Sequence, residues 1–321
     1  MGKGCLDVSV VMSVKDDEHF IAQSVESILD QNDVDFEFII VNDGSTDRTG
    51  ETIAKFQRKD SRIKVIEQKH KGLTNALITG CILANGKYIA RQDAGGDVSL
   101  PGRLRSQFEL LEGDDDAVMV GSGTRFVGPH GEYLYDTVMS QDELDQGLQS
   151  LTITSVRSPP HCCAMMRNSA YKKIGGYRGV FYVAQDLDLW MRLYETGKTI
   201  ADETIRYVAK VRPRDISSLY RKRQIETTKY ILEAARLRRS GRDDTVMLDL
   251  AKQTKQKIPR SNIVRKLYNN NQEAKGLYHI GSCINLTDSE RARHYYRLAL
   301  RKQPLHIRAL LRLLSSYRNK V

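Results

Sequence analysis

The sequence predicts an α/β fold, with a mainly parallel sheet flanked by helices and an α-helical region at the C-terminal end. Strand-like apolar runs alternate with helical patterns through the first 120 residues. Such alternation is typical of βαβ units, whose sheet is covered on both faces. From residue 216 onward the pattern is almost wholly helical. We therefore predict two domains, at residues 1–215 and 216–321.

The elements of the first domain follow from the spacing of its apolar residues. Apolar, β-branched runs predict strands at residues 8–14, 36–41, 63–66 and 87–91. Apolar residues at helical spacing predict the helices between them, at residues 18–30, 46–56 and 73–83. Further along we expect strands or hairpins within 116–135, a helix near 140–150, a strand within 159–166 and a helix at 184–196. Residues 276–316 predict either one tetratricopeptide-like helix pair or an ordinary helical hairpin.

Charge is divided unevenly between the two predicted domains. Residues 216–321 hold 24 Lys and Arg against 8 Asp and Glu, a net charge of +16, whereas residues 1–215 hold 26 against 32, a net charge of −6. A basic region favours anionic partners. Its charges are interleaved with leucines, as on a solvated amphipathic face. We expect peripheral contact with an anionic membrane or a protein partner through this tail, and no nucleic acid.

Targeting and redox signals are weak. No apolar stretch reaches the roughly 18 residues that a membrane-spanning helix needs, and the apolar run near the N-terminus is too short for a signal peptide. The five cysteines are odd in number and form no CxxC pair, which favours reduced thiols over disulfides or a zinc site. We expect a cytoplasmic protein that is peripheral at the inner membrane face.

Acidic residues gather after the predicted strands. Ligands of parallel sheets bind beyond the carboxyl ends of the strands. The segments at these ends are 15–17, 42–45, 67–70 and 92–97, and three of the four are rich in carboxylates. Carboxylates suit hard cations and sugar hydroxyls, so this edge predicts a site for a metal ion and a polar ligand. No GxGxxG follows the first strand, which disfavours a dehydrogenase-type Rossmann domain.

Five segments, taken in order, resemble glycosyltransferase family 2 over roughly the first two thirds of the chain. They cover residues 8–16, 41–47, 71–76, 91–97 and 184–193. The resemblance implies the GT-A fold and an inverting transfer of a sugar from a nucleoside-diphosphate sugar to an acceptor hydroxyl. From it we expect a UDP-sugar donor and a saccharide or lipid-linked acceptor in surface polysaccharide synthesis.

The resemblance implies that Asp16, Asp43 and Lys71 contact the nucleotide. Asp16 ends a strand that lies against the base in the family, where Lys15 and Asp16 replace the usual tyrosine and asparagine. Asp43 is expected to bind uracil or ribose, because a carboxylate accepts from an imide N–H or a hydroxyl; turning the chain and capping the next helix is its alternative role. Lys71, beside a helix N-terminus, favours phosphate, although a plain helix start explains this segment too.

A metal site is implied at Asp93 and Asp97, in a segment that resembles the family's Asp-x-Asp motif. Gly95 stands where the family has its second acid, and Asp97 follows two residues later. The two consecutive glycines allow a loop that brings Asp97 in; the alternative is an acidic turn before the helix near Pro101. Mg²⁺ or Mn²⁺ fits carboxylate and phosphate oxygens and stabilises a departing diphosphate. Asp93 is expected to contact both the donor and the metal.

The fifth segment implies that Asp186 is the general base that removes the proton of the acceptor hydroxyl. Gln185 replaces the family's glutamate before it. Asp188 is expected to form a structural ion pair or cap, and Trp190 to lie in the core. His161 occupies a position that relatives place near the acceptor, although a lone histidine is usually structural.

Two other functional classes are kept as alternatives. Ser13, Gly95 and Gln185 depart from the family pattern at important places. These departures suit a non-catalytic sugar-nucleotide-binding or scaffolding protein, which would bind UDP without turning over UDP-sugars. A nucleic-acid-binding protein that uses the basic helices is the third hypothesis.

Overall fold

The computed structural model describes residues 6–213, 220–255 and 262–318. The chain forms two compact units. The first comprises residues 1–124, 136–209 and 227–252, and the second comprises residues 125–135, 210–226 and 253–321. The predicted boundary at residues 215/216 lies outside the described residues, so the division into domains stays a prediction.

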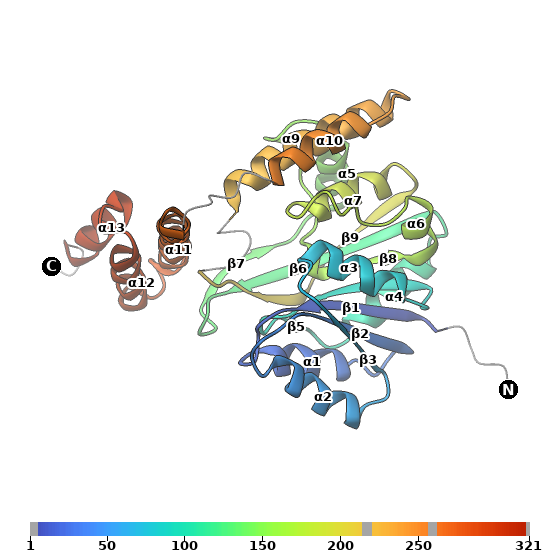
Figure 1. Ribbon diagram of the computed structural model, residues 1–321, viewed down its shortest axis with the longest axis horizontal. Helices are drawn as coiled ribbons and strands as arrows, with labels where there is room; N and C mark the ends of the chain where they lie inside the picture. The colour runs from blue at the N-terminus through green and yellow to red at the C-terminus, as the bar shows by residue number, and fades with distance from the viewer. Residues whose placement is uncertain (1–5, 214–219, 256–261, 319–321) are drawn as a thin grey trace. The chain divides into compact units, whose positions relative to one another are not determined.

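The predicted parallel strands are present and form half of one sheet (Figure 1). They are β1 (Val8–Val14), β2 (Phe36–Asp43), β3 (Ile63–Gln68) and β4 (Tyr88–Asp93), in the spatial order β3-β2-β1-β4. The intervening helices are α1 (Ile21–Leu29), α2 (Thr49–Lys59) and α3 (Leu73–Ile82). All three strand pairs are parallel, which confirms the predicted βαβ pattern.

Beyond β4 the sheet continues with strands of mixed direction. They are β5 (Val98–Ser99), β6 (Ala117–Val127), β7 (Tyr133–Thr137), β8 (Ala164–Arg167) and β9 (Lys198–Lys210). The order continues β4-β8-β6-β9-β5, with β7 paired to β6, and β8 is antiparallel to both β4 and β6. The helices in this part are α4 (Arg103–Glu112), α5 (Gln141–Gln149), α6 (Asn168–Lys173) and α7 (Gln185–Tyr194).

Alternate residues of the strands build a separate core on each face of the sheet. Val11 and Ile39 pack with α3, α5 and α7, whereas their neighbours Val10 and Phe38 pack with α1, α2 and α4. Strands buried on both faces read as continuous apolar runs, which is why the sequence predicts them well. Trp190 is fully buried in the first of these cores, as expected.

Two sequence expectations need correction. The predicted strand within 159–166 begins only at Ala164, because Pro159 and Pro160 are followed by a 3₁₀ turn, His161–Cys163. The long strand β9 was not predicted at all. Its Lys, Asp, Glu and Arg residues interrupt any apolar run, and it is only partly buried.

The helical region begins with α9 (Arg221–Arg239) and α10 (Thr245–Lys255). It continues with α11 (Asn262–Ile284), α12 (Ser289–Lys302) and α13 (Ile307–Arg318), which pack in sequence around Ala292, Tyr296 and Ala309. The C-terminal helices are therefore present as predicted, and the tetratricopeptide-like interpretation stays a prediction. Within the described ranges, no helix combines the length and the apolar content that crossing a bilayer requires.

Candidate active site

The carboxyl ends of β1, β2 and β4 lie side by side, because Val14 pairs with Asn42 and Ser13 with Asp93. Asp16, which follows β1, is hydrogen-bonded to the loop that follows β2. Its backbone N–H donates to Ser45 Oγ at 3.0 Å, and its Oδ1 accepts from the Thr46 N–H at 2.8 Å. Hydrogen bonds from Lys15 and Thr46 lower the pKa of Asp16. Asp16 is thus an ionised, partly exposed carboxylate at the predicted nucleotide edge.

Asp43 organises the loop between β3 and α3. Its side chain is only 3% exposed, and it accepts four hydrogen bonds. They come from Gln68 Nε2 at 2.7 Å, His70 Nδ1 at 2.8 Å and the backbone N–H groups of Lys71 and Gly72, each at 2.8 Å. Burial alone would raise the pKa of Asp43, but these donors outweigh it and lower the pKa.

Lys71 meets Asp43 through its backbone, while its side chain is exposed. The end of β2 at Asp43 and the β3–α3 loop that contains Lys71 are therefore held together by this hydrogen bond. Gly44, the residue after Asp43, packs closely against this loop. Its φ is +73°, and a Cβ at this position would lie only 2.8 Å from the backbone nitrogen of His70, so a glycine is favoured there. The contacts of Asp43 with its own chain are structural, and its nucleotide role stays a prediction.

The double-glycine loop brings Asp93 and Asp97 together. Gly95 and Gly96 have φ of +97° and +84°, values that residues with a Cβ rarely adopt. The Gly95 N–H donates to Asp17 Oδ2 at 2.7 Å, and the Gly96 N–H donates to Ser24 Oγ at 3.0 Å. The loop is therefore held in this shape by side chains from the start of the chain.

Asp93, Asp97 and Cys162 each place one ligand atom within 4.8 Å of the others. Two carboxylates suit Mg²⁺ or Mn²⁺, so these residues fit the implied metal. Burial raises the pKa of the Cys162 thiol well above its usual value, and Cys163, Asp93 and Asp97 raise it further. A neutral thiol avoids a third negative charge beside the two acids.

Two buried arginines lie beneath this acidic loop. Arg91, fully buried, donates to Asp93 Oδ1 at 2.5 Å and to His161 Nε2 at 3.2 Å. Arg103 donates to the carbonyls of Cys162 at 3.2 Å and Arg91 at 2.7 Å. The Arg91 guanidinium pairs directly with the Asp93 carboxylate, and the buried Arg103 adds a second positive charge close to it.

His161 is a half-buried hydrogen-bond acceptor. Its Nε2 faces the Arg91 guanidinium and lies 2.6 Å from the Tyr177 hydroxyl. Burial and the charge of Arg91 lower the pKa of His161 well below its usual value. A neutral ring with Nε2 unprotonated satisfies both contacts, so His161 supports the site by holding Arg91.

Asp186 lies in the first turn of α7, directly after Gln185 and two residues after Ala184, whose φ of +55° is left-handed. Burial raises the pKa of Asp186; backbone hydrogen bonds lower it, Asp93 raises it further and Arg91 opposes that rise. Asp186 therefore interacts electrostatically with both Asp93 of the acidic loop and Arg91. A raised pKa makes a carboxylate a stronger base.

The family model of glycosyl transferase family 2 matches residues 9–175, just over half of the chain. The chain belongs to glycosyltransferase family 2. Among curated relatives, the putative glycosyltransferase EpsE of Bacillus subtilis is 35% identical over 197 residues, which are 59% of this chain and 67% of that protein. The O-antigen biosynthesis glycosyltransferase WbnJ of Escherichia coli is 29% identical over 188 residues, 58% of this chain and 71% of that protein.

The fold of this glycosyltransferase is the predicted GT-A fold. The crystal structure of Staphylococcus aureus TarS 1-349 in complex with UDP superposes with a TM-score of 0.51 at 17% identity, over 98% of this chain and 89% of that one. At this identity the likeness concerns the fold alone. The site roles of individual residues in this chain are therefore argued from its own geometry.

Sequence reasoning missed several residues of this glycosyltransferase site. Asp17 and Ser24 shape the glycine loop from more than 70 positions away, which no local pattern reveals. Cys162 joins the acidic pair only through folding. Arg91 left one usable signal, since an arginine within an apolar strand such as β4 needs a buried anionic or carbonyl partner, whereas Arg103, the first residue of α4, left none.

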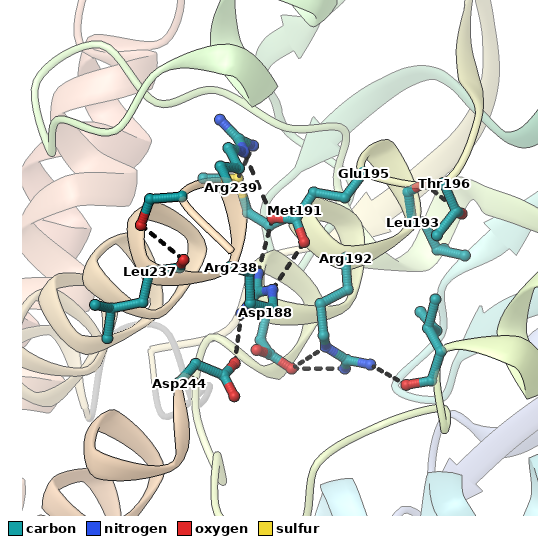
Figure 2. Close-up of polar contacts among 12 residues, drawn as sticks. Asp188, Met191, Arg192, Leu193, Glu195, Thr196, Leu237, Arg238, Arg239 and Asp244 are labelled. Carbon is teal, nitrogen blue, oxygen red and sulfur yellow. Dashed lines mark hydrogen bonds and ion pairs between the residues drawn. The ribbon is translucent and has the colours of Figure 1, made fainter. Parts of the chain in front are cut away.

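Asp188 and Arg192 form the ion pair expected on α7. Asp188 is fully buried, and its Oδ2 accepts from Arg192 at 2.6 and 3.0 Å. The far end of α7 is tied to α9, because Arg238 donates to both oxygens of Glu195 (Figure 2). Residues of α9 thus hold α7, the helix that carries Asp186 in its first turn.

Proposed function

We propose that this family 2 member is an inverting glycosyltransferase that moves a sugar from a UDP-sugar to a hydroxyl of a saccharide or lipid-linked acceptor. The observation that carries the proposal is the convergence of Asp93 and Asp97, with Asp186 in the same electrostatic field. An acid-rich edge of this kind suits a donor whose leaving group is a diphosphate. A role in surface polysaccharide synthesis is supported by the O-antigen assignment of WbnJ.

In the proposed reaction, Asp186 accepts the proton of the acceptor hydroxyl. The acceptor oxygen forms a bond to the anomeric carbon as the bond from that carbon to the diphosphate oxygen breaks, and the diphosphate leaves with the bonding pair. The raised pKa of Asp186 favours this proton transfer. Its place in the first turn of α7 exposes the carboxylate to the positive end of the helix dipole, which stabilises the ionised form before the reaction.

Asp16, Asp43 and Lys71 are proposed to contact the UDP moiety. They lie on two neighbouring loops at one edge of the sheet, which supports a shared ligand. Asp93 and Asp97 would hold Mg²⁺ or Mn²⁺, which when bound supplies positive charge to the diphosphate leaving group. The choice of UDP as the nucleotide draws on the TarS structure, which was solved in complex with UDP.

Calorimetric titration of UDP, with and without manganese, tests the donor site. Wild type is expected to bind UDP in a manganese-dependent way, and Asp93→Asn is expected to lose that dependence. The exposed Asp115→Asn is the matched control. Absence of UDP binding by wild type under both conditions would refute the UDP donor site. Retained UDP binding without turnover of any UDP-sugar would favour the non-catalytic alternative.

We also propose that the basic tail contacts an anionic membrane surface. Four exposed aliphatic side chains form a stripe at helical spacing on α13, namely Ile307, Leu310, Leu311 and Leu314. The helix packs through Ala309 and Leu313 instead, and the basic residues Arg308 and Arg312 lie beside the stripe. An apolar stripe bordered by basic residues is typical of helices that lie in a membrane interface.

Flotation with vesicles that contain anionic lipid tests this membrane contact. The wild-type protein is expected to float with the vesicles at low salt and to be released at high salt. The double substitution of Leu310 and Leu314 by Glu is expected to abolish flotation. Leu286→Glu, at an exposed leucine outside the stripe, is the control. Equal flotation of both variants would count against the stripe as the membrane contact.

A further inference from the structure

The thiol of Cys162 lies against the two acidic residues of the glycine loop. Its sulfur is within 4.8 Å of a carboxylate oxygen of each of Asp93 and Asp97. The residue is only 5% exposed, and its thiol makes no hydrogen bond to any part of the chain that the structure describes. The adjacent Cys163 differs, because its thiol donates to the carbonyls of Ser122 at 3.0 Å and Pro160 at 3.2 Å.

We infer that Cys162 is a third protein ligand of the divalent cation, and that the site therefore prefers manganese or a softer transition metal to magnesium. The inference rests on the proposed function, which places the cation between Asp93 and Asp97. Thiolate is a soft ligand that favours transition metals, whereas magnesium demands oxygen ligands. Two oxygens and one sulfur make a mixed donor set that magnesium matches poorly.

The backbone holds Cys162 in this position. The residue lies in the 3₁₀ turn His161–Cys163, which directly precedes β8. Its carbonyl accepts from Arg103 Nη1 at 3.2 Å, and the same guanidinium donates to the Arg91 carbonyl on β4 at 2.7 Å. Arg103 thus ties the turn to the strand that ends in Asp93. The sulfur is presented to the acidic pair by a rigid frame.

Charge balance allows the thiol to ionise when the cation binds. Coordination through sulfur would require the cation to displace the thiol proton, which would pass to the solvent, so the protein ligands would be two carboxylates and one thiolate. The buried guanidinium groups of Arg91 and Arg103 and the cation itself would supply positive charge beside these ligands. The ligand set is therefore compatible with the low dielectric of its surroundings.

Titration with cobalt(II), followed by absorption, tests this coordination without relying on turnover. Wild type is expected to show a near-ultraviolet thiolate-to-cobalt charge-transfer band. Cys162→Ser is expected to lose the band and to bind cobalt about tenfold more weakly or worse, by analogy with the loss of metal-supporting residues. Cys163→Ala is the matched control, which keeps the band because its thiol points to backbone carbonyls instead.

A band that persists in Cys162→Ser would overturn the inference, and so would cobalt binding by wild type without any band, or no cobalt binding at all. Competition of manganese and magnesium against bound cobalt gives a second readout. Wild type should favour manganese over magnesium more strongly than Cys162→Ser does. UDP binding in magnesium, measured on the same variants, tests the donor site separately. Its retention alongside a failed cobalt result would reject only the cysteine ligand.

Discussion

Arg238 offers the most direct test of how α9 supports the helix of the proposed base. Its Nε and Nη2 donate to the two oxygens of Glu195 at 2.7 and 2.9 Å, and its Nη1 donates to Asp244 at 2.7 Å. Glu195 directly follows α7, and Asp244 directly precedes α10. Arg238 is only 17% exposed. Replacing it with alanine therefore removes three charge-assisted hydrogen bonds from a largely buried junction.

The expected cost of Arg238→Ala is smaller than the sum of its three bonds. A hydrogen bond to a charged group contributes about 1.5–3 kcal/mol. Asp244 keeps Arg178 at 2.6 Å, and Glu195 keeps a weaker contact with Arg239 at 3.5 Å. Neither carboxylate is left unpaired. We therefore expect a loss of about 2–3 kcal/mol in the free energy of unfolding, rather than the full cost of a stranded buried charge.

Urea unfolding followed by tryptophan fluorescence measures this loss. The chain has a single tryptophan, Trp190, which lies on α7 and is fully buried, so it reports on this part of the molecule. Arg236→Ala is the control, because Arg236 pairs with Glu233 on its own helix and is 50% exposed. Its expected cost is about 0.5 kcal/mol. Equal midpoints for the two variants would refute the view that α9 stabilises α7 through Arg238.

Three further outcomes follow from the site geometry. Asp186→Asn should lower kcat by about 10²–10⁴-fold and leave the affinity for UDP unchanged. In wild type, kcat should fall on the acid side of its pH profile at a pH above the ordinary aspartate pKa of about 3.9, because the pKa of Asp186 is raised. Gly95→Ala should destabilise the protein by about 1–3 kcal/mol and weaken manganese binding measured by calorimetry, whereas Gly113→Ala, at φ −74°, should do neither. Asp43→Asn should lower thermal stability at pH 7. Because the folded pKa of Asp43 is lowered, its contribution is present above about pH 3.9 and is lost as the pH falls through the folded value, so melting curves of the two proteins should converge in acid.

The parallel half of the fold was predictable because its strands are buried on both faces. The continuous apolar runs of β1 and β2 are shielded from water when both faces of the sheet are covered, and the helices that cover them carry one apolar face each. β9 was not predictable in the same way. Only part of it is buried, and its polar residues have partners far away in the sequence: Asp202, for example, accepts a hydrogen bond from Ser122 on β6.

The candidate site likewise combines residues that the local sequence places with a loop whose shape depends on tertiary contacts. Asp43, Asp93 and Asp186 follow strands or open a helix, so local sequence places them at the carboxyl edge. Whether Asp97 joins Asp93 depends on the shape of the glycine loop, which Asp17 fixes across a separation of 78 residues. The sequence permits that loop, and only the tertiary contacts select it.

The buried arginines explain how an acidic edge on a net-negative domain accommodates an anionic donor. Residues 1–215 carry a net charge of −6, which repels a nucleoside diphosphate at long range. Arg91 donates to Asp93 and Arg103 donates to the carbonyl of Cys162, and both side chains are fully buried, so they place positive charge beside the acids without being exposed at the edge. A cation placed above the same acids would complete the compensation from the solvent side. The proposed binding of a diphosphate at this loop should therefore depend strongly on the metal.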